Sequence, residues 1–427
     1  MNRTQFPRLG ETCFETELDN GLTICVIPRP GYLKSYAFFA TGYGGMNLRF
    51  RTEDGWQDSP AGVAHFLEHK MFDTKEGNAL QILTANGASP NAFTMADMTG
   101  YYFECTEGFA ENLRTLLSFV SQPYFTQESV AKEQGIIGQE IQMIEDNPDW
   151  RLYQNLLRAL YRNNPLRIPL AGSKNSIAEI TADTLYQCHR AFYHPGNMVL
   201  CVVGDVDPEQ VAAIAQDVLP QERRDRAEKD LGAPEPDAPA ERQITEVMAV
   251  SSPNFLLGLK ARPHPTGEED LRLQLLGDLA GDILAGESSP LYAKLYSEGL
   301  IDKSFFVSYE SSPGTAFLML GGESKQVDPV TEAILDEGAR LRREGINPDL
   351  FRRCKKAAYG SRVRALNSMD HVGTRLAAGK LKGYHYYRFA DLYDTIALED
   401  IQAFLDGLIR QDCAALSVVT PKGTADA

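Results

Sequence analysis

A segment without apolar periodicity divides this chain of 427 residues near its middle. Residues 221–243 read QERRDRAEKDLGAPEPDAPAERQ and are charged and rich in Pro and Ala. Such a composition is typical of an interdomain linker. Because a single hydrophobic core rarely extends over more than about 250–300 residues, the sequence predicts two domains, 1–220 and 244–427, joined by the linker 221–243.

The two halves follow similar orders of predicted elements. The first half begins with strand-like segments at 16–29 and 35–45 and closes with a strand at 197–206. The second opens with a strand-like segment at 246–261 and closes with one at 413–421. In both, groups of helices separate the strands, which favours an α+β class over a regular βαβ alternation. We therefore expect two related halves, each a mainly antiparallel sheet packed against helices.

Two histidines and a glutamate lie close together in one predicted helix. The segment 59–72, SPAGVAHFLEHKMF, predicts a helix with Ser59 as its N-cap. Side chains four positions apart lie one above the other on a helix, so His65 and His69 can present two imidazoles to one metal ion. Glu68 lies on the same side. A buried helix with an unrelated glutamate is the alternative, but burying that carboxylate without a partner is costly.

Two carboxylates on a second predicted helix, which starts near Thr126, can complete such a site. A catalytic zinc takes three protein ligands and keeps a fourth position for water. Glu133 and Glu140 are separated by nearly two helical turns, so they face the same way. One can bind the metal, and the other can accept a hydrogen bond from a ligand histidine. The spacing alone does not decide which carboxylate takes which role.

The composition excludes several classes of partner. The formal net charge of −16 argues against nonspecific binding of nucleic acid or of anionic membranes. No segment approaches the about 20 uninterrupted apolar residues needed to cross a bilayer. The first residues, MNRTQFPRLGETCFETELD, resemble neither a secretory signal nor a transit peptide. We expect a cytoplasmic location.

The cysteines and the remaining histidines predict no further site. The chain has seven cysteines and no C-x-x-C pair, which argues against a disulfide framework and against a cysteine zinc site. Each cysteine is expected to be a buried, inert thiol. His385 flanks a helical stretch without an acidic residue at ligand spacing.

Several segments together resemble a known family. GVAHFLEHKMF at 62–72 contains H-x-x-E-H, the inverted form of the common zinc-protease motif, and EQGIIGQEI follows at 133–141. With NGASPNAFTMADMTGYYFE at 86–104 and YHPGNMVLCVVGDVD at 193–207, the chain resembles the insulinase/pitrilysin family of zinc metallopeptidases. The resemblance covers about residues 10–220 and is faint beyond them.

The resemblance implies a zinc-dependent endopeptidase acting on peptides or unfolded segments inside a chamber. By position, His65, His69 and Glu140 look like the ligands of one zinc ion per chain. Glu68 looks like the general base on the zinc-bound water, and Glu133 like the carboxylate that supports a ligand histidine. The alternative is a noncatalytic peptide-binding or assembly subunit that retains the fold.

A second implied feature is a strand that binds the substrate. The segment Asn91-Ala92-Phe93-Thr94 resembles the family's edge strand, onto which an extended peptide adds through main-chain hydrogen bonds, and Asn91, Ala92 and Phe93 look like its substrate-binding residues. Many members also carry an Arg and a Tyr in the second half, where this chain has Tyr296 and Asp302.

The missing Arg/Tyr pair bears on the expected partners. The chain length matches the short form of the family, whose members pair two chains, like the mitochondrial processing peptidase. We therefore expect a heterodimer in which a sibling subunit supplies the Arg/Tyr clamp, with a homodimer as the alternative. A peptide is the expected substrate, and neither nucleic acid nor a membrane is an expected partner.

Overall fold

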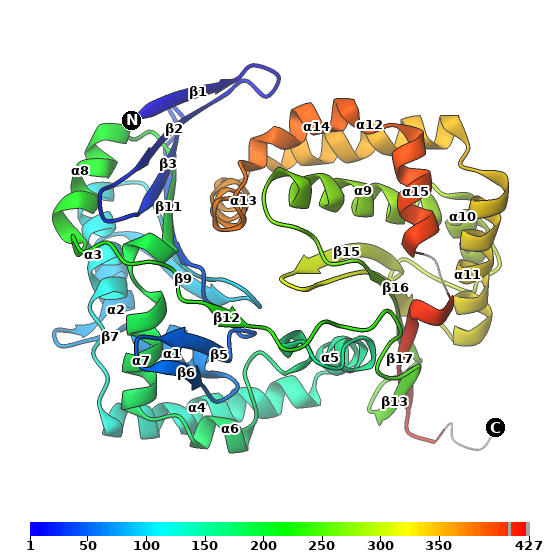
Figure 1. Cartoon of the computed structure of the whole chain (residues 1–427), viewed down its shortest axis with the longest axis horizontal. Helices are drawn as coiled ribbons and strands as arrows, with labels where there is room; N and C mark the ends of the chain where they lie inside the picture. Colours follow the sequence, from blue (N-terminus) through cyan, green and yellow to red (C-terminus); the bar gives the residue numbers. More distant parts are fainter. Residues whose placement is uncertain (409–410, 424–427) are drawn as a thin grey trace. The chain divides into compact units, whose positions relative to one another are not determined.

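A computed structural model describes residues 1–408 and 411–423 of the chain (Figure 1). These residues form two compact units that each combine segments from both halves of the sequence. Unit 1 comprises 1–141, 169–231 and 363–388, and unit 2 comprises 142–168, 232–362 and the residues from 389 onward. Within the described ranges, no helix is both long and apolar enough to cross a bilayer.

Unit 1 is built on a seven-stranded sheet of order β1-β2-β3-β11-β4-β10-β9. Of its neighbouring pairs, β3 and β11 run parallel and the others antiparallel. The strands are Asn2–Phe6 (β1), Glu11–Glu17 (β2), Thr23–Pro28 (β3), Ser35–Thr41 (β4), Ala88–Thr94 (β9), Thr99–Cys105 (β10) and Met198–Gly204 (β11). A small three-stranded sheet contains Arg49–Thr52 (β5), Gly55–Asp58 (β6) and Lys229–Asp230 (β12). A two-stranded sheet contains Asp73–Thr74 (β7) and Gly77–Asn78 (β8).

Helices pack on both faces of the large sheet. Alternate residues of a strand point to opposite faces, so one strand can contact helices on both sides. On one face, Phe103 of β10 contacts Phe109 of α3 (Phe109–Ser121), with ring centroids 5.7 Å apart. On the other, Tyr36 of β4 donates a 2.9 Å hydrogen bond to Asp370 of α13 (Met369–Lys382). A Cβ on Gly373 would lie 2.7 Å from the Tyr36 ring, so the glycine permits this close approach.

The other helices of unit 1 connect or cover these strands. They are Val63–Met71 (α1), Ala79–Ala85 (α2), Gln127–Asp146 (α4, which continues into unit 2), Lys174–Ala178 (α6), Ala182–Phe192 (α7) and Pro208–Val218 (α8). Short 3-10 turns occur at Pro165–Arg167, Pro195–Asn197, Tyr386–Arg388 and Gln411–Cys413.

Unit 2 repeats the strand order of unit 1. Its sheet has the order β13-β17-β14-β16-β15, with β13 and β17 parallel, as β3-β11-β4-β10-β9 has β3 and β11 parallel. The strands are Gln243–Met248 (β13), Asn254–Ala261 (β14), Phe306–Ser312 (β15), Thr315–Glu323 (β16) and Ala414–Pro421 (β17). This duplicated topology confirms the prediction of an α+β fold in two related halves.

The single strand predicted at 246–261 is wrong. The chain forms β13 and β14, which pair with opposite sides of β17, and it leaves the sheet between them at Ser251–Pro253. Pro253 has no backbone N–H to donate to a sheet, which favours a break there. The helices of unit 2 are Pro148–Leu160 (α5), Glu268–Ala285 (α9), Pro290–Ser297 (α10), Val327–Glu344 (α11), Pro348–Ala365 (α12), Phe389–Thr395 (α14) and Leu398–Leu408 (α15).

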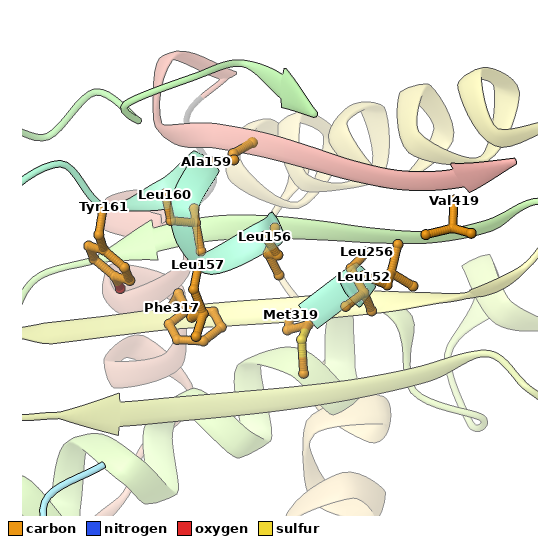
Figure 2. Packing of buried hydrophobic residues seen from close by; sticks show 11 residues of the cluster. Leu152, Leu156, Leu157, Ala159, Leu160, Tyr161, Leu256, Phe317, Met319 and Val419 are labelled. Carbon is orange, nitrogen blue, oxygen red and sulfur yellow. The ribbon is translucent and has the colours of Figure 1, made fainter. Parts of the chain in front are cut away.

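Helix α5 belongs to the core of unit 2 although it precedes the predicted linker. Figure 2 shows its leucines beside residues of the second sheet. A Cβ on Gly258 of β14 would lie 2.9 Å from the side chains of both Leu156 and Leu160, so the glycine lets the helix pack closely. In the opposite direction, α13 follows the linker and packs in unit 1. The units therefore differ from the linear boundaries 1–220 and 244–427.

The predicted linker 221–243 contains one of the five points at which the chain passes from one unit to the other, between residues 231 and 232. It is ordered by specific contacts. Strand β12 pairs with β5 in unit 1. In unit 2 the Glu235 carboxylate accepts hydrogen bonds from the backbone N–H groups of Arg162, Asn163 and Asn164. The segment 221–243 therefore contributes to the structure of both units in addition to connecting them.

Candidate metal centre

Helix α1, which carries the H-x-x-E-H segment, begins at Val63 and ends at Met71. The prediction of Ser59 as its N-cap is wrong, because the Ser59 hydroxyl donates to the backbone oxygen of Leu48 at 3.1 Å. Gly62 occupies the cap position with φ of 92°. A Cβ there would lie 2.5 Å from the backbone oxygen of Ala171, so only glycine suits both the left-handed conformation and the space.

Helix α4 directs the carboxylates of Glu133 and Glu140 toward α1. Ile137 lies between these two residues in the sequence, and its side chain is fully buried. The Gln134 side chain donates hydrogen bonds to the backbone oxygens of Ile177 and Ile180, at 3.2 and 3.0 Å. These bonds fix α4 against α6 and the residues that directly follow α6. Both Glu133 and Glu140 consequently reach the histidines of α1, as their seven-residue spacing predicts.

Three side chains converge at the centre of this arrangement. The rings of His65 and His69 lie 4.6 Å apart. Glu140 Oε1 is 3.4 Å from His65 Nε2, and Glu140 Oε2 is 3.6 Å from His69 Nε2. Donor atoms about 2.0–2.2 Å from a tetrahedral zinc lie roughly 3.3–3.6 Å from one another. One ligand atom from each residue lies within 4.8 Å of the others, so the donor set fits a zinc ion in number, type and spacing.

Glu133 lies behind His69, away from the three converging donors. Its Oε1 is 3.1 Å from His69 Nδ1, which is the arrangement for a donated Nδ1–H. That bond leaves Nε2 of His69 with a lone pair directed toward the Glu140 side. Lys70 contacts Glu133 at 3.7 Å and also pairs with Asp73. Glu140 and Glu133 therefore lie on opposite sides of the His69 ring, a difference that their spacing in the sequence does not predict.

The hydrogen bonds and charges of this group lower the pKa values of Glu133 and Glu140 and raise that of His69. Burial opposes ionisation of Glu133, but the hydrogen bond from His69 and the charge of Lys70 outweigh it and lower the pKa of Glu133. The hydrogen bond to His65 lowers the pKa of Glu140. Burial opposes the charged form of His69, but its bond to Glu133 and the neighbouring carboxylates raise its pKa.

Glu68 lies beside the converging donors and is 8% exposed. Its Oε2 accepts a 2.9 Å hydrogen bond from the Thr94 hydroxyl. Burial raises the pKa of Glu68, while the charge of His65 and the bond from Thr94 act in the opposite direction. A carboxylate with a raised pKa beside a metal-type donor set is a suitable proton acceptor for water.

The predicted substrate strand is β9, which lies at the edge of the seven-stranded sheet. Among the strands that the structure describes, β9 pairs with β10 alone. Asn91 is exposed, and the Phe93 ring stacks on Phe38 with centroids 5.6 Å apart. The strand ends at Thr94, whose hydroxyl reaches Glu68. The unpaired edge of β9 therefore runs to the candidate centre.

Unit 2 offers no corresponding donor set among its described residues, since the two groups with metal-ligand spacing both lie in unit 1. Tyr296 is 46% exposed and stacks on Tyr292 at 5.9 Å. Asp302 accepts hydrogen bonds from the backbone and hydroxyl of Ser304. Neither residue is cationic, so the second half carries no positive charge at these two positions.

Two contacts of the centre were not predicted from the sequence. Thr94 binds Glu68, and Lys70 binds Glu133. Thr94 is the last residue of the predicted Asn91–Thr94 strand, which is the one local signal for its position. The Lys70 contact depends on how α4 passes α1, and nothing in the local sequence indicates it.

Family models, curated proteins and solved structures are all similar to this chain. The family described as "Insulinase (Peptidase family M16)" matches residues 56–174, and "Peptidase M16 inactive domain" matches 179–358. The chain is 36% identical over 425 residues to "Uncharacterized zinc protease YmfH" of Bacillus subtilis, covering 98% of this chain and 99% of that one. An M16-like peptidase structure from Alicyclobacillus acidocaldarius superposes with a TM-score of 0.93 at 33% identity, covering 98% of this chain and 100% of the other.

A further relative concerns only part of the chain. "Probable mitochondrial-processing peptidase subunit beta" of Schizosaccharomyces pombe is 26% identical over 224 residues, which is 51% of this chain and 47% of that protein.

Proposed function

The chain belongs to the M16, or insulinase, family of peptidases, and from this premise we propose that it is a zinc-dependent endopeptidase acting on peptides or unfolded segments. The observation that carries the proposal is the convergence of His65, His69 and Glu140 beside the buried Glu68. The alternative is a noncatalytic peptide-binding or assembly subunit. The complete donor set favours the enzyme, since such a subunit has no need of it.

In this proposal each residue of the centre has one task. His65, His69 and Glu140 hold the ion, and Glu133 fixes the Nδ1–H tautomer of His69. When bound, zinc supplies Lewis acidity that polarises the peptide carbonyl and lowers the pKa of water to about 7. Glu68 accepts the proton of the attacking water and returns it to the leaving nitrogen. Thr94 holds the Glu68 carboxylate in position through its hydroxyl.

We propose that the substrate binds along β9. An extended peptide can pair with the open edge through the main chain of Asn91, Ala92 and Phe93. This strand leads to Thr94 and Glu68, so a peptide aligned on it would run toward the base. Recognition through the main chain predicts weak sequence selectivity and a preference for unstructured peptides.

The proposed partner is a sibling subunit that supplies an Arg/Tyr clamp, in a heterodimer. Tyr296 and Asp302 stand where many members of the family carry that pair. A homodimer with a divergent clamp is the alternative. The proposed location is the cytoplasm. Assaying the chain alone and with a sibling subunit separates the two assemblies, since full activity of the lone chain excludes an obligate heterodimer.

Removal of the metal should abolish cleavage of a quenched peptide. We expect a chelator to remove zinc together with the activity, and stoichiometric Zn²⁺ to restore both, because the three ligands provide one open position for chemistry. Metal content and fluorescence release are measured on the same sample, with and without the sibling subunit. Cleavage that persists in metal-free protein would contradict the proposal. Stable metal binding without cleavage in either sample would favour the noncatalytic alternative.

A Thr94→Val substitution should lower kcat by about tenfold without loss of zinc. A hydrogen bond to a charged group contributes about 1.5–3 kcal/mol, and water can replace part of it at Glu68. KM should change little, because the main chain of β9 is retained. Thr94→Ser restores the hydroxyl and is expected to restore kcat. A valine variant with full turnover would remove Thr94 from the positioning of the base.

A further inference from the structure

A second group of metal-type ligands lies in unit 1 and shares no residue with the centre on α1 and α4. It consists of Cys13 and Glu15 on β2 and Cys25 on β3. Both sulfur atoms lie 3.7 Å from Glu15 Oε1, and the three donor atoms all fall within 4.8 Å of one another. Both thiols are fully buried. We propose that these three residues bind a thiophilic cation, with Zn²⁺ as the representative ion.

The donor chemistry selects this class of ion. Two thiolates and a carboxylate suit zinc, for which Cys sulfur lies at about 2.3 Å and carboxylate oxygen at about 2.0–2.2 Å. Soft thiolate ligands disfavour Mg²⁺ and Ca²⁺, which prefer oxygen. The three ligands leave a fourth position for water or another small ligand.

The strand register argues against a disulfide between the same two thiols. Glu15 lies opposite Cys25, and Phe14 opposite Val26, so Cys13 and Cys25 are diagonal neighbours on antiparallel strands. Diagonal pairs have Cα atoms about 7–8 Å apart, whereas disulfides usually require about 4.4–6.8 Å. A metal ion can bridge two sulfurs at this separation without moving the strands.

The charge of the cluster suits the exchange of protons for a divalent ion. Glu15 accepts from Lys380 Nζ at 2.8 Å, so their charges cancel while the thiols are protonated. When a divalent cation replaces the two thiol protons, the net charge of the cluster is unchanged. The large cost of adding charge to a buried site is thereby avoided.

His385 supports Glu15 and is not itself a ligand in this proposal. The backbone N–H of Tyr387 donates to His385 Nδ1 at 3.1 Å, so the neutral ring carries its proton on Nε2. That nitrogen lies 3.1 Å from Glu15 Oε1. Sequence spacing indicated no acidic partner for His385, because Glu15 lies at the other end of the chain and meets it only through the fold.

An opening to solvent provides a route for the ion. A surface cavity of about 410 Å³ is lined by Glu15, Lys380 and His385, among others. The carboxylate thus joins this cavity to the buried thiols. Cys201 of β11 lies opposite Cys25 in register but outside the three-ligand group.

The experiment uses the full chain with the double substitution His65→Ala/His69→Ala, so that only the second group can bind. Addition of Co²⁺ is expected to produce near-ultraviolet thiolate-to-metal charge-transfer absorption that saturates at one ion per chain. Adding Cys13→Ser/Cys25→Ser should remove this absorption, and the matched buried pair Cys105→Ser/Cys188→Ser should leave it unchanged. Glu15→Gln tests the site without touching the thiols, and we expect Co²⁺ affinity to fall at least tenfold.

The readout is independent of peptidase activity, so its failure is separate from failure of the proposed function. The inference is overturned if reduced protein with a native circular dichroism spectrum shows no thiolate absorption with Co²⁺. It is also overturned if the absorption survives in a folded Cys13→Ser/Cys25→Ser variant, or if Glu15→Gln leaves the affinity unchanged.

Discussion

Glu68→Gln should eliminate peptide hydrolysis while the protein retains its zinc. The amide preserves the size of the side chain and can still accept the Thr94 hydrogen bond, but it cannot take a proton from water. General acid–base groups contribute about 10²–10⁴-fold to rate, so we expect kcat to fall by at least that range. The measurement pairs turnover of a quenched peptide with zinc content of the same preparation.

Glu128→Gln is the matched control for this experiment. Glu128 is exposed in the first turn of α4, so the same chemical change there should alter neither zinc content nor turnover. Full turnover by a metal-loaded Glu68→Gln variant would exclude Glu68 as the base. Loss of zinc together with activity would show that Glu68 also contributes to binding the ion.

Glu140→Gln should weaken zinc binding far more than Glu133→Gln. Glu140 faces both histidines through their Nε2 atoms, whereas Glu133 contacts Nδ1 of His69 and, on its other side, Lys70. Substitution of a residue that supports a ligand typically costs 10- to 100-fold in metal affinity. We therefore expect a loss within that range for Glu133→Gln and a larger one for Glu140→Gln, measured by competition with a chromophoric chelator.

Each of these two substitutions serves as the control for the other, because both exchange a glutamate for glutamine on the same helix. Equal losses would mean that the carboxylates share the ion. A larger loss for Glu133→Gln would reverse the two roles and contradict the proposed ligand set.

The sequence predicted those parts of the site that depend on local periodicity. His65 and His69 face one way because they are four residues apart on a helix, and Glu133 and Glu140 because they are seven apart. The sequence could not distinguish the two glutamates, since that depends on which nitrogen of His69 meets which carboxylate. It also did not predict the contact of Thr94 with Glu68, because that contact depends on where the edge of the sheet passes α1.

The fold, like the site, was predictable from the sequence only in part. Strand and helix order indicated a duplicated α+β plan, and the repeated sheet order bears this out. The order of elements did not predict that α5 packs in unit 2 and α13 in unit 1. An amphipathic helix does not specify which sheet will bury its apolar face. Similarly, Glu15 and His385 meet only because α13 returns to the first sheet.

That return of α13 has a consequence for the order of events during protein synthesis. A ribosome releases the N-terminal strands first, yet unit 1 lacks its last segment until residue 388 has emerged. Until then, the face of the sheet that includes Tyr36 has no α13 to cover it. The nascent polypeptide therefore exposes apolar surface through most of translation, and such surface is prone to aggregation until α13 covers it.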